Sequence, residues 1–394
     1  MTTPEIVIVA AARTPQGRLQ GGLSSISAPE LGGAANAGAL AASGVPAPAV
    51  EADSMGQVLP AGNGQNPARQ AALAGGIGWS VPASGVNKVC LSGLTAIIDA
   101  IRMIRTGDAE VVVAGGMESM SRAPHLLPGS RSGWSYGSIE VLDHVAFDGL
   151  TDAHDRESMG ASTERLNERF SVTREEQDAV AARSHQRAAA ARSAGRFTAE
   201  IVPVLVPQRR GEPVVVDADE GIRPDSTVET LAGLRPAFAP GGAITAGNAS
   251  PISDGAAAVI LTTRERAERE DWTILAAVGA NGQVAGPDNS LHEQPAAAIE
   301  RAVAKQGITV DELDLIEINE AFGAVVAASE RRLGVSSDIV NIDGGGIALG
   351  HPIGASGARL VVHLAHELAR RGSGTAVAAL CGGGGQGEAL ILTR

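Results

Sequence analysis

The sequence predicts an α/β protein, in which strands and helices alternate along the chain. Short apolar runs such as Ile6 to Ala10 are separated by longer segments with a helical period. Glycines, of which there are 50, gather directly after these runs, where tight turns and close backbone approaches occur. The order of elements also recurs in the second part of the chain, which predicts a duplicated α/β half.

Each expected element rests on a local pattern. Four apolar runs predict strands, at residues 6–10, 111–114, 315–318 and 375–380. Ser92-Gly93 opens an apolar helix that precedes the second of these strands, and Ser356-Gly357 opens one over 358–370 that precedes the fourth. Residues 53–75 and 314–334 each predict a strand, a polar loop and an alanine-rich helix. These two pairs of segments are the basis of the predicted duplication.

A segment of different character, rich in charged and turn residues, separates the two halves. Its helix is predicted from Thr173 to Ala194, because Thr173 and Glu176 form a capping box and Gly195 follows the last helical residue. We therefore expect an inserted loop domain at 122–245. The N-terminal half would comprise 1–121, completed by 246–268, and the C-terminal half 269–394.

Composition excludes several classes of protein. The 394 residues are 44% hydrophobic and 19% charged, which is typical of a folded chain with a large core. A net charge of -13 and an aromatic content of 2% argue against nucleic acid and acidic membranes as partners. With Lys88 and Lys305 as the only lysines, no phosphate-binding Walker motif can be written. The N-terminus lacks the features of a secretory signal, so we expect a cytoplasmic protein.

Cys90 and Cys381 are the only cysteines, and their spacing fits neither a disulfide framework nor a metal site. Cys90 precedes the apolar helix at residue 92, whose macrodipole would favour the nucleophilic thiolate. Cys381 ends a strand before four glycines, whose backbone N–H groups could stabilise an oxyanion. From these local patterns alone, either cysteine could equally be a small core residue.

Two further polar residues follow strands. His351 stands in a glycine-rich turn before a helix, where an imidazole can act as a base. Asn319 follows the strand at 315–318 and could orient a water or a carbonyl group, or cap the next helix. Gly133-Trp-Ser-Tyr-Gly137 matches the nucleophile elbow of serine hydrolases, but no buried strand precedes it and no apolar helix follows it.

Taken together, six blocks in order resemble the signature blocks of the thiolase family over essentially the whole chain. They are Asn87-Lys-Val-Cys-Leu-Ser-Gly93, Gly115-Gly-Met-Glu-Ser-Met120, Ala246-Gly-Asn-Ala-Ser250, Asn319-Glu-Ala-Phe322, Gly350-His-Pro-Ile-Gly-Ala-Ser-Gly357 and Cys381-Gly-Gly-Gly-Gly385. The resemblance implies a thiolase fold, with two duplicated α/β halves in a five-layer αβαβα arrangement and an inserted loop domain. It also implies a homotetramer or a homodimer.

By matching position, the resemblance assigns catalytic roles. Cys90 would be the acylated nucleophile, His351 would take its proton, and Cys381 would be the acid and base at the α-carbon of the second acyl-CoA. Asn319, through a water, would form one oxyanion hole with His351. The backbone N–H groups of Cys90 and Gly383 would form the other.

The implied substrates are coenzyme A thioesters, with no metal or cofactor. Condensation of two acetyl-CoA molecules to acetoacetyl-CoA and CoA is the first expectation. The alternatives are cleavage of longer 3-ketoacyl-CoA substrates and non-catalytic binding of acyl-CoA or lipid. Residues expected to contact CoA or the acyl group are Arg223, Ser250, Met159 and Phe322. Ser158, where familiar short-chain members carry histidine, and the 290–295 segment depart from the family pattern and leave the chain length open.

Overall fold

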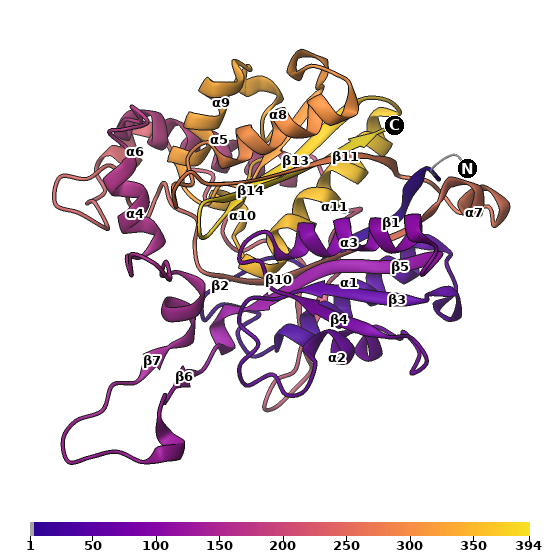
Figure 1. The fold of residues 1–394 in the computed structure, drawn as a ribbon, viewed down its shortest axis with the longest axis horizontal. Coiled ribbons are helices and arrows are strands. Elements are labelled where there is room, and N and C mark those ends of the chain that lie inside the picture. The colour runs from indigo at the N-terminus through magenta and orange to yellow at the C-terminus, as the bar shows by residue number, and fades with distance from the viewer. Residues whose placement is uncertain (1–3) are drawn as a thin grey trace.

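The structure is a computed structural model that describes residues 4–394 (Figure 1). Its strands are β1 (Ile6–Arg13), β2 (Gly17–Arg18), β3 (Ala52–Gly56), β4 (Ala83–Val86), β5 (Val111–Ser119), β6 (His125–Leu126), β7 (Leu142–Asp143), β8 (Val204–Val206), β9 (Val214–Val216), β10 (Ser253–Thr263), β11 (Ala276–Ala285), β12 (Leu315–Ile318), β13 (Thr375–Gly382) and β14 (Gln386–Thr393). Its α-helices are α1 (Ala28–Ser43), α2 (Pro67–Ala74), α3 (Ser92–Thr106), α4 (Met159–Leu166), α5 (Arg174–Ser193), α6 (Val228–Ala232), α7 (Arg264–Arg269), α8 (Gln294–Gln306), α9 (Gly323–Leu333), α10 (Gly346–Leu349) and α11 (Ile353–Arg371).

The main sheet contains both halves and repeats one topology. Nine strands follow the order β12-β13-β14-β11-β1-β10-β5-β3-β4, and β2 adds to β10. β3 runs parallel to β5, and its counterpart β12 runs parallel to β13. The next strand in each half, β10 or β14, is antiparallel to its neighbour. The halves join where β1 pairs with β11 over only two residue pairs, Val7 with Ala277 and Ile8 with Ala276.

The helices form three layers, one between the two halves of the main sheet and one on the outer face of each half, as Figure 1 shows. α3 and α11 lie between the halves and share one core cluster with side chains from both. α1 and α2 pack on the outer face of the N-terminal half, and α8 and α9 on that of the C-terminal half. β1 alternates accordingly, because Ile6 and Ile8 face the central helices whereas Val7 and Val9 face α1. The five-layer arrangement that the resemblance implied is confirmed.

The individual elements also agree with the sequence, apart from their ends. Each predicted strand is present, and the helix expected over 358–370 begins earlier, at Ile353. Its first five residues include Gly354 and Gly357, which allow the helix to approach the end of β3 and α3 closely. The capping box of Thr173 and Glu176 is confirmed at the start of α5.

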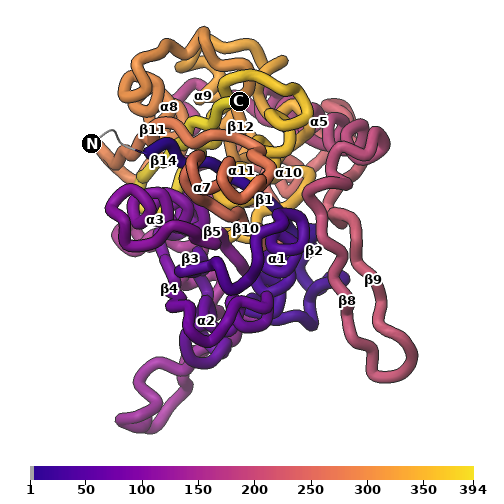
Figure 2. Tube along the Cα trace, turned by 90° about the vertical axis from the view of Figure 1, so that its right-hand side faces the viewer, coloured from indigo at the N-terminus to yellow at the C-terminus, as the bar shows by residue number. Residues whose placement is uncertain are grey.

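The segment between β5 and β10 carries the elements outside the two halves. α4 to α6 pack beside the C-terminal half, and β6 and β7 begin and end a projecting arm, residues 125–143 (Figure 1). A second hairpin, β8 with β9, extends along the opposite side (Figure 2). The residue boundaries of the predicted domains stay a prediction.

Ser135 lies on the exposed arm without a strand before it or a helix directly after it, so the serine-hydrolase interpretation is wrong.

Candidate active site

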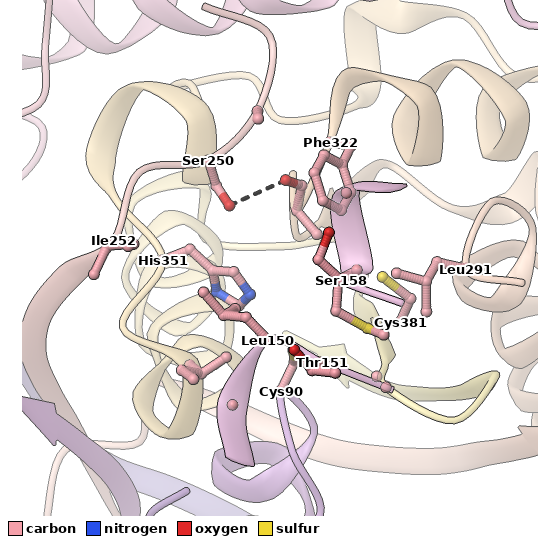
Figure 3. Close-up of a pocket in the computed structure, with 18 of the residues that line it drawn as sticks. Cys90, Leu150, Thr151, Ser158, Ser250, Ile252, Leu291, Phe322, His351 and Cys381 are labelled. Carbon is pink, nitrogen blue, oxygen red and sulfur yellow. Dashed lines mark hydrogen bonds between the residues drawn. The ribbon is translucent and has the colours of Figure 1, made fainter. Parts of the chain in front are cut away.

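The predicted catalytic residues meet at one cavity of about 350 Å³ between the two halves and the inserted segment (Figure 3). Cys90, His351, Cys381 and Gly383 line it. Most of the remaining wall is apolar and comes from Met120, Leu150, Met159, Phe238, Ile252, Leu291, Phe322 and Ile353, among others. The cavity therefore offers an apolar pocket around two thiols and one imidazole.

Cys90 stands on a tight turn directly before α3. The preceding residue, Val89, has a φ of 52°, a left-handed conformation that β-branched residues rarely adopt. Leu91 is the N-cap of α3, so the Cys90 thiol lies outside the first helical turn. The backbone N–H groups of Gly383 and of Cys90 itself lie close enough to the sulfur to favour its charged form.

Burial of Cys90 opposes the thiolate form that the helix macrodipole would favour. Burial raises the pKa of the thiol to about 12, although the N–H groups of Gly383 and Cys90 lower it. The nearby carboxylate of Glu118 raises it further. Desolvation of a charged sulfur thus outweighs the helix dipole, which acts strongly only within the first turn.

Cys381 occupies the next-to-last position of β13 and is 1% exposed. Burial raises the pKa of its thiol well above the ordinary range, and the neighbouring Cys90 adds to this effect. Its strand ends at Gly382, and the following glycines leave the cavity side of the turn without side chains. The thiolate of such a cysteine is a strong base.

His351 lies in the turn before α11, where its ring faces the cavity (Figure 3). Its Nδ1 is 2.5 Å from Ser356 Oγ, and that hydroxyl donates its hydrogen to the Pro352 carbonyl at 2.9 Å. The hydroxyl therefore accepts from Nδ1–H, which assigns the tautomer with a free lone pair on Nε2. Burial, with the nearby Arg359, lowers the pKa of His351 to about 4, so the imidazole is neutral at pH 7.

Asn319 completes the polar side of the site, buried behind the imidazole. Its Nδ2 is 3.4 Å from both ring nitrogens of His351, and its Oδ1 is buried without a partner in residues 4–394. The alternative in which Asn319 caps the next helix is wrong, because Phe322 is the N-cap of α9. An unpartnered buried oxygen fits the predicted water-holding role.

Glu118 is a buried site residue that sequence reasoning missed. Its carboxylate accepts backbone N–H groups from Val58 at 2.9 Å, Leu59 at 3.1 Å and Gly354 at 3.0 Å. Burial raises its pKa to about 7, against these bonds. Glu118 thereby joins the end of β5 to the turn that carries His351. The sequence signal that could have identified Glu118 was its position in the signature block Gly115-Gly-Met-Glu-Ser-Met120.

The residues predicted to contact the substrate are divided by the structure. Met159, Ser250 and Phe322 line the cavity, and Ser250 Oγ donates to the Ala321 carbonyl at 3.0 Å. Arg223 is exposed and is not among the lining residues.

Both departures from the family pattern reach the cavity. Ser158 lines it and caps α4, and Leu291 lines it from the 290–295 segment. His292 in that segment is buried and stacks on Phe170 with ring centroids 4.3 Å apart.

Residues 4–394 contain no group of three or more His, Cys, Asp or Glu side chains that could hold a metal ion. No helix within the same range is long and apolar enough to cross a membrane.

Fold and site together define a five-layer α/β protein whose two related halves enclose a cavity with a thiol from each half and an imidazole. The thiolase N-terminal domain model matches residues 6–265, and the thiolase C-terminal domain model matches residues 272–394. The chain belongs to the thiolase family, as its sequence blocks predicted.

Full-length relatives support this assignment. A probable acetyl-CoA acetyltransferase of Mycolicibacterium smegmatis is 58% identical over 98% of this chain and 100% of its own. One of Mycobacterium tuberculosis is 58% identical over 100% of this chain and 99% of its own. The crystal structure of the Bacillus anthracis acetyl-CoA acetyltransferase superposes with a TM-score of 0.96 at 39% identity, with 99% of both chains covered.

Proposed function

We propose that this protein catalyses the reversible condensation of two acetyl-CoA molecules to acetoacetyl-CoA and CoA. The observation that carries the proposal is the meeting of Cys90, His351 and Cys381 at one cavity, which Gly383 also lines. Acyl transfer between thioesters needs a thiol nucleophile, a base and a preorganised oxyanion site. The names of the relatives above point to the same reaction.

In the first half-reaction, the Cys90 sulfur attacks the carbonyl carbon of acetyl-CoA while His351 Nε2 takes the thiol proton. Both groups are neutral at rest, so proton transfer accompanies the attack. As the C–S bond to CoA breaks, Cys381 gives its proton to the departing sulfur. The products are acetyl-Cys90, free CoA, a protonated His351 and a Cys381 thiolate.

In the second half-reaction, the Cys381 thiolate removes a proton from the methyl group of another acetyl-CoA. Burial makes this thiolate a strong base, as an unactivated C–H bond requires. Protonated His351 and a water held by Asn319 would stabilise the enolate oxygen. The enolate carbon then attacks acetyl-Cys90, whose carbonyl oxygen faces the N–H groups of Gly383 and Cys90. Cys90 leaves as a thiolate and recovers the proton from His351.

The balance of atoms and electrons in these steps requires no oxidant, reductant, metal or organic cofactor.

We propose that the apolar wall with Met159, Ser250 and Phe322 holds the acyl group and the adjoining arm of CoA. Arg223 would meet a phosphate of CoA outside the cavity, which its exposed guanidinium supports.

We also propose that the protein is a homo-oligomer, a tetramer or a dimer. The projecting arm exposes apolar side chains that a monomer would leave in water, namely Leu127, Trp134, Tyr136, Ile139 and Val141. β4 is an edge strand in which Ser84 and Gly85 are exposed, so it could pair with a second copy. Light scattering of the purified protein measures this directly. The expected cytoplasmic location stays a prediction.

The testing experiment is CoA-dependent cleavage of acetoacetyl-CoA, compared with a long-chain 3-ketoacyl-CoA at equal enzyme concentration. We expect strong preference for acetoacetyl-CoA and ping-pong kinetics, and no turnover by Cys90→Ala. Mass spectrometry after acetyl-CoA addition should find the acetyl group on Cys90. Comparable cleavage of the long-chain substrate would instead identify a broad 3-ketoacyl-CoA thiolase. Turnover by Cys90→Ala would overturn the mechanism.

A further inference from the structure

An ion pair that the proposed chemistry does not use joins the two halves beside the nucleophile. Lys88 Nζ lies 3.2 Å from Glu388 Oε1. Glu388 belongs to β14 in the C-terminal half and is fully buried, and the Lys88 side chain is 23% exposed. Lys88 lies only two residues before Cys90.

The Glu388 carboxylate receives donors from three separate parts of the fold. Besides Lys88, Thr95 Oγ1 of α3 donates to Oε2 at 2.6 Å, and Gln283 Nε2 of β11 donates to Oε1. A buried carboxylate is costly unless such partners satisfy it, and its position is then fixed by all of them. Glu388 is therefore a rigid anchor for the Lys88 side chain.

The main chain next to Lys88 is strained. Val89, at its φ of 52°, follows Lys88 directly. The Lys88 N–H donates to Ser92 Oγ at 2.9 Å, and Ser92 Oγ donates to the Val89 carbonyl at 2.6 Å. Strain of this kind persists only where the surroundings hold it. Local bonds and the ion pair with the other half together fix the turn.

Glu388 is also connected through the sheet to Gly383, which belongs to the proposed oxyanion site. β13 and β14 are paired, with Glu388 opposite Leu380 and Gly387 opposite Cys381. The chain continues from β13 to Gly383, and the Val89 methyl groups lie 3.3 and 3.7 Å from where a Cβ on Gly383 would stand. A shift of Lys88 relative to Glu388 would therefore move the Cys90 turn relative to the Gly383 turn.

We propose that Lys88 and Glu388 are positioning residues, whose ion pair across the two halves holds the turn that carries Cys90 in place against the Gly383 turn. Neither residue lines the cavity, and both act through the Cys90 turn. The proposal rests on the proposed function, because that function gives the placement of Cys90 against Gly383 its catalytic value. It also makes a claim about Cys90 reactivity that needs no turnover to test.

The experiment compares Lys88→Met, Glu388→Gln and their combination with the wild type. Each single variant should lower kcat for acetoacetyl-CoA cleavage about 10- to 100-fold with little change in KM, since small misplacements of reacting groups have costs of that order. The combination should lose no more than the worse single variant. Alkylation of Cys90 by iodoacetamide, followed from pH 7 to 10 by peptide mass spectrometry, should show a higher thiol pKa in both variants.

Two controls separate positioning from folding. Lys88→Arg can still pair with Glu388 and should recover most of kcat. Lys305→Met changes the other lysine, whose Nζ bonds Asn281, and should leave kcat and alkylation unchanged. Folded single variants with wild-type kcat and a wild-type alkylation profile would overturn the proposal. If Lys88→Met fails to fold, Glu388→Gln and Lys88→Arg carry the same test. An inactive wild type would overturn the proposed function, and the alkylation profiles would then still decide the positioning claim.

Discussion

Replacing Ser356 by alanine should slow the chemistry much more than it weakens substrate binding. The Ser356 hydroxyl is the acceptor for His351 Nδ1–H, and both residues are buried. When His351 takes the Cys90 proton, this bond becomes one to a charged imidazolium, and such bonds contribute about 1.5–3 kcal/mol. Because about 1.4 kcal/mol corresponds to a tenfold change in rate, kcat should fall roughly 10- to 150-fold.

The assay is steady-state cleavage of acetoacetyl-CoA, with thermal unfolding as a check of the fold. Ser253→Ala is the matched control, because Ser253 Oγ accepts the backbone N–H of His351 at 3.1 Å and does not bond the ring. We expect that control to change kcat less than threefold, in contrast to Ser356→Ala. If Ser356→Ala kept wild-type kcat, or changed only KM, the tautomer assigned to His351 would be refuted.

Two further variants test packing and electrostatics. Gly116→Ala would place a Cβ 2.1 Å from the Gly354 carbonyl oxygen, and should lower the free energy of unfolding by about 3 kcal/mol in urea titrations, whereas Gly78→Ala, whose nearest neighbour is 3.8 Å away, should be neutral. Equal stability of these two variants would contradict the close approach of β5 to the His351 turn. Burial raises the pKa of Asp53 to about 8, so its folded form binds a proton that the unfolded form has already released, and stability should fall by up to about 1.4 kcal/mol per pH unit from pH 4 to 8. Asp53→Asn should lack this loss, so its advantage over the wild type should grow across that range, and parallel pH profiles would disprove the shift.

Much of the fold could be read from the sequence because its signals are local. The run Leu315 to Ile318 predicted β12 to the residue, because a short, mostly apolar run before a polar turn is typical of a buried strand. The capping box of Thr173 likewise placed the start of α5. The duplication was visible because each half of the sequence repeats Ser-Gly, an apolar helical segment, an apolar run and Gly-Gly in the same order.

The site was predicted less evenly. Residues at strand ends, such as Cys381 and Asn319, were found because loops that follow strands converge at one edge of a sheet. Their roles came from resemblance to a family and not from the residues alone. Arg223 lies outside the cavity, so its expected contact with CoA stays a prediction.

Local patterns in the sequence were sufficient to place the strands and helices, the apolar face of each, and the residues at the turns. The tertiary structure was needed to know the direction of the Cys90 pKa shift, because desolvation depends on chain segments distant in sequence that cover the sulfur. It also decided the partners of Glu118 and Glu388, which bond groups 59 to 300 residues away. Local patterns carry periodicity and turn chemistry, whereas burial and long-range pairing arise only when the two halves pack together.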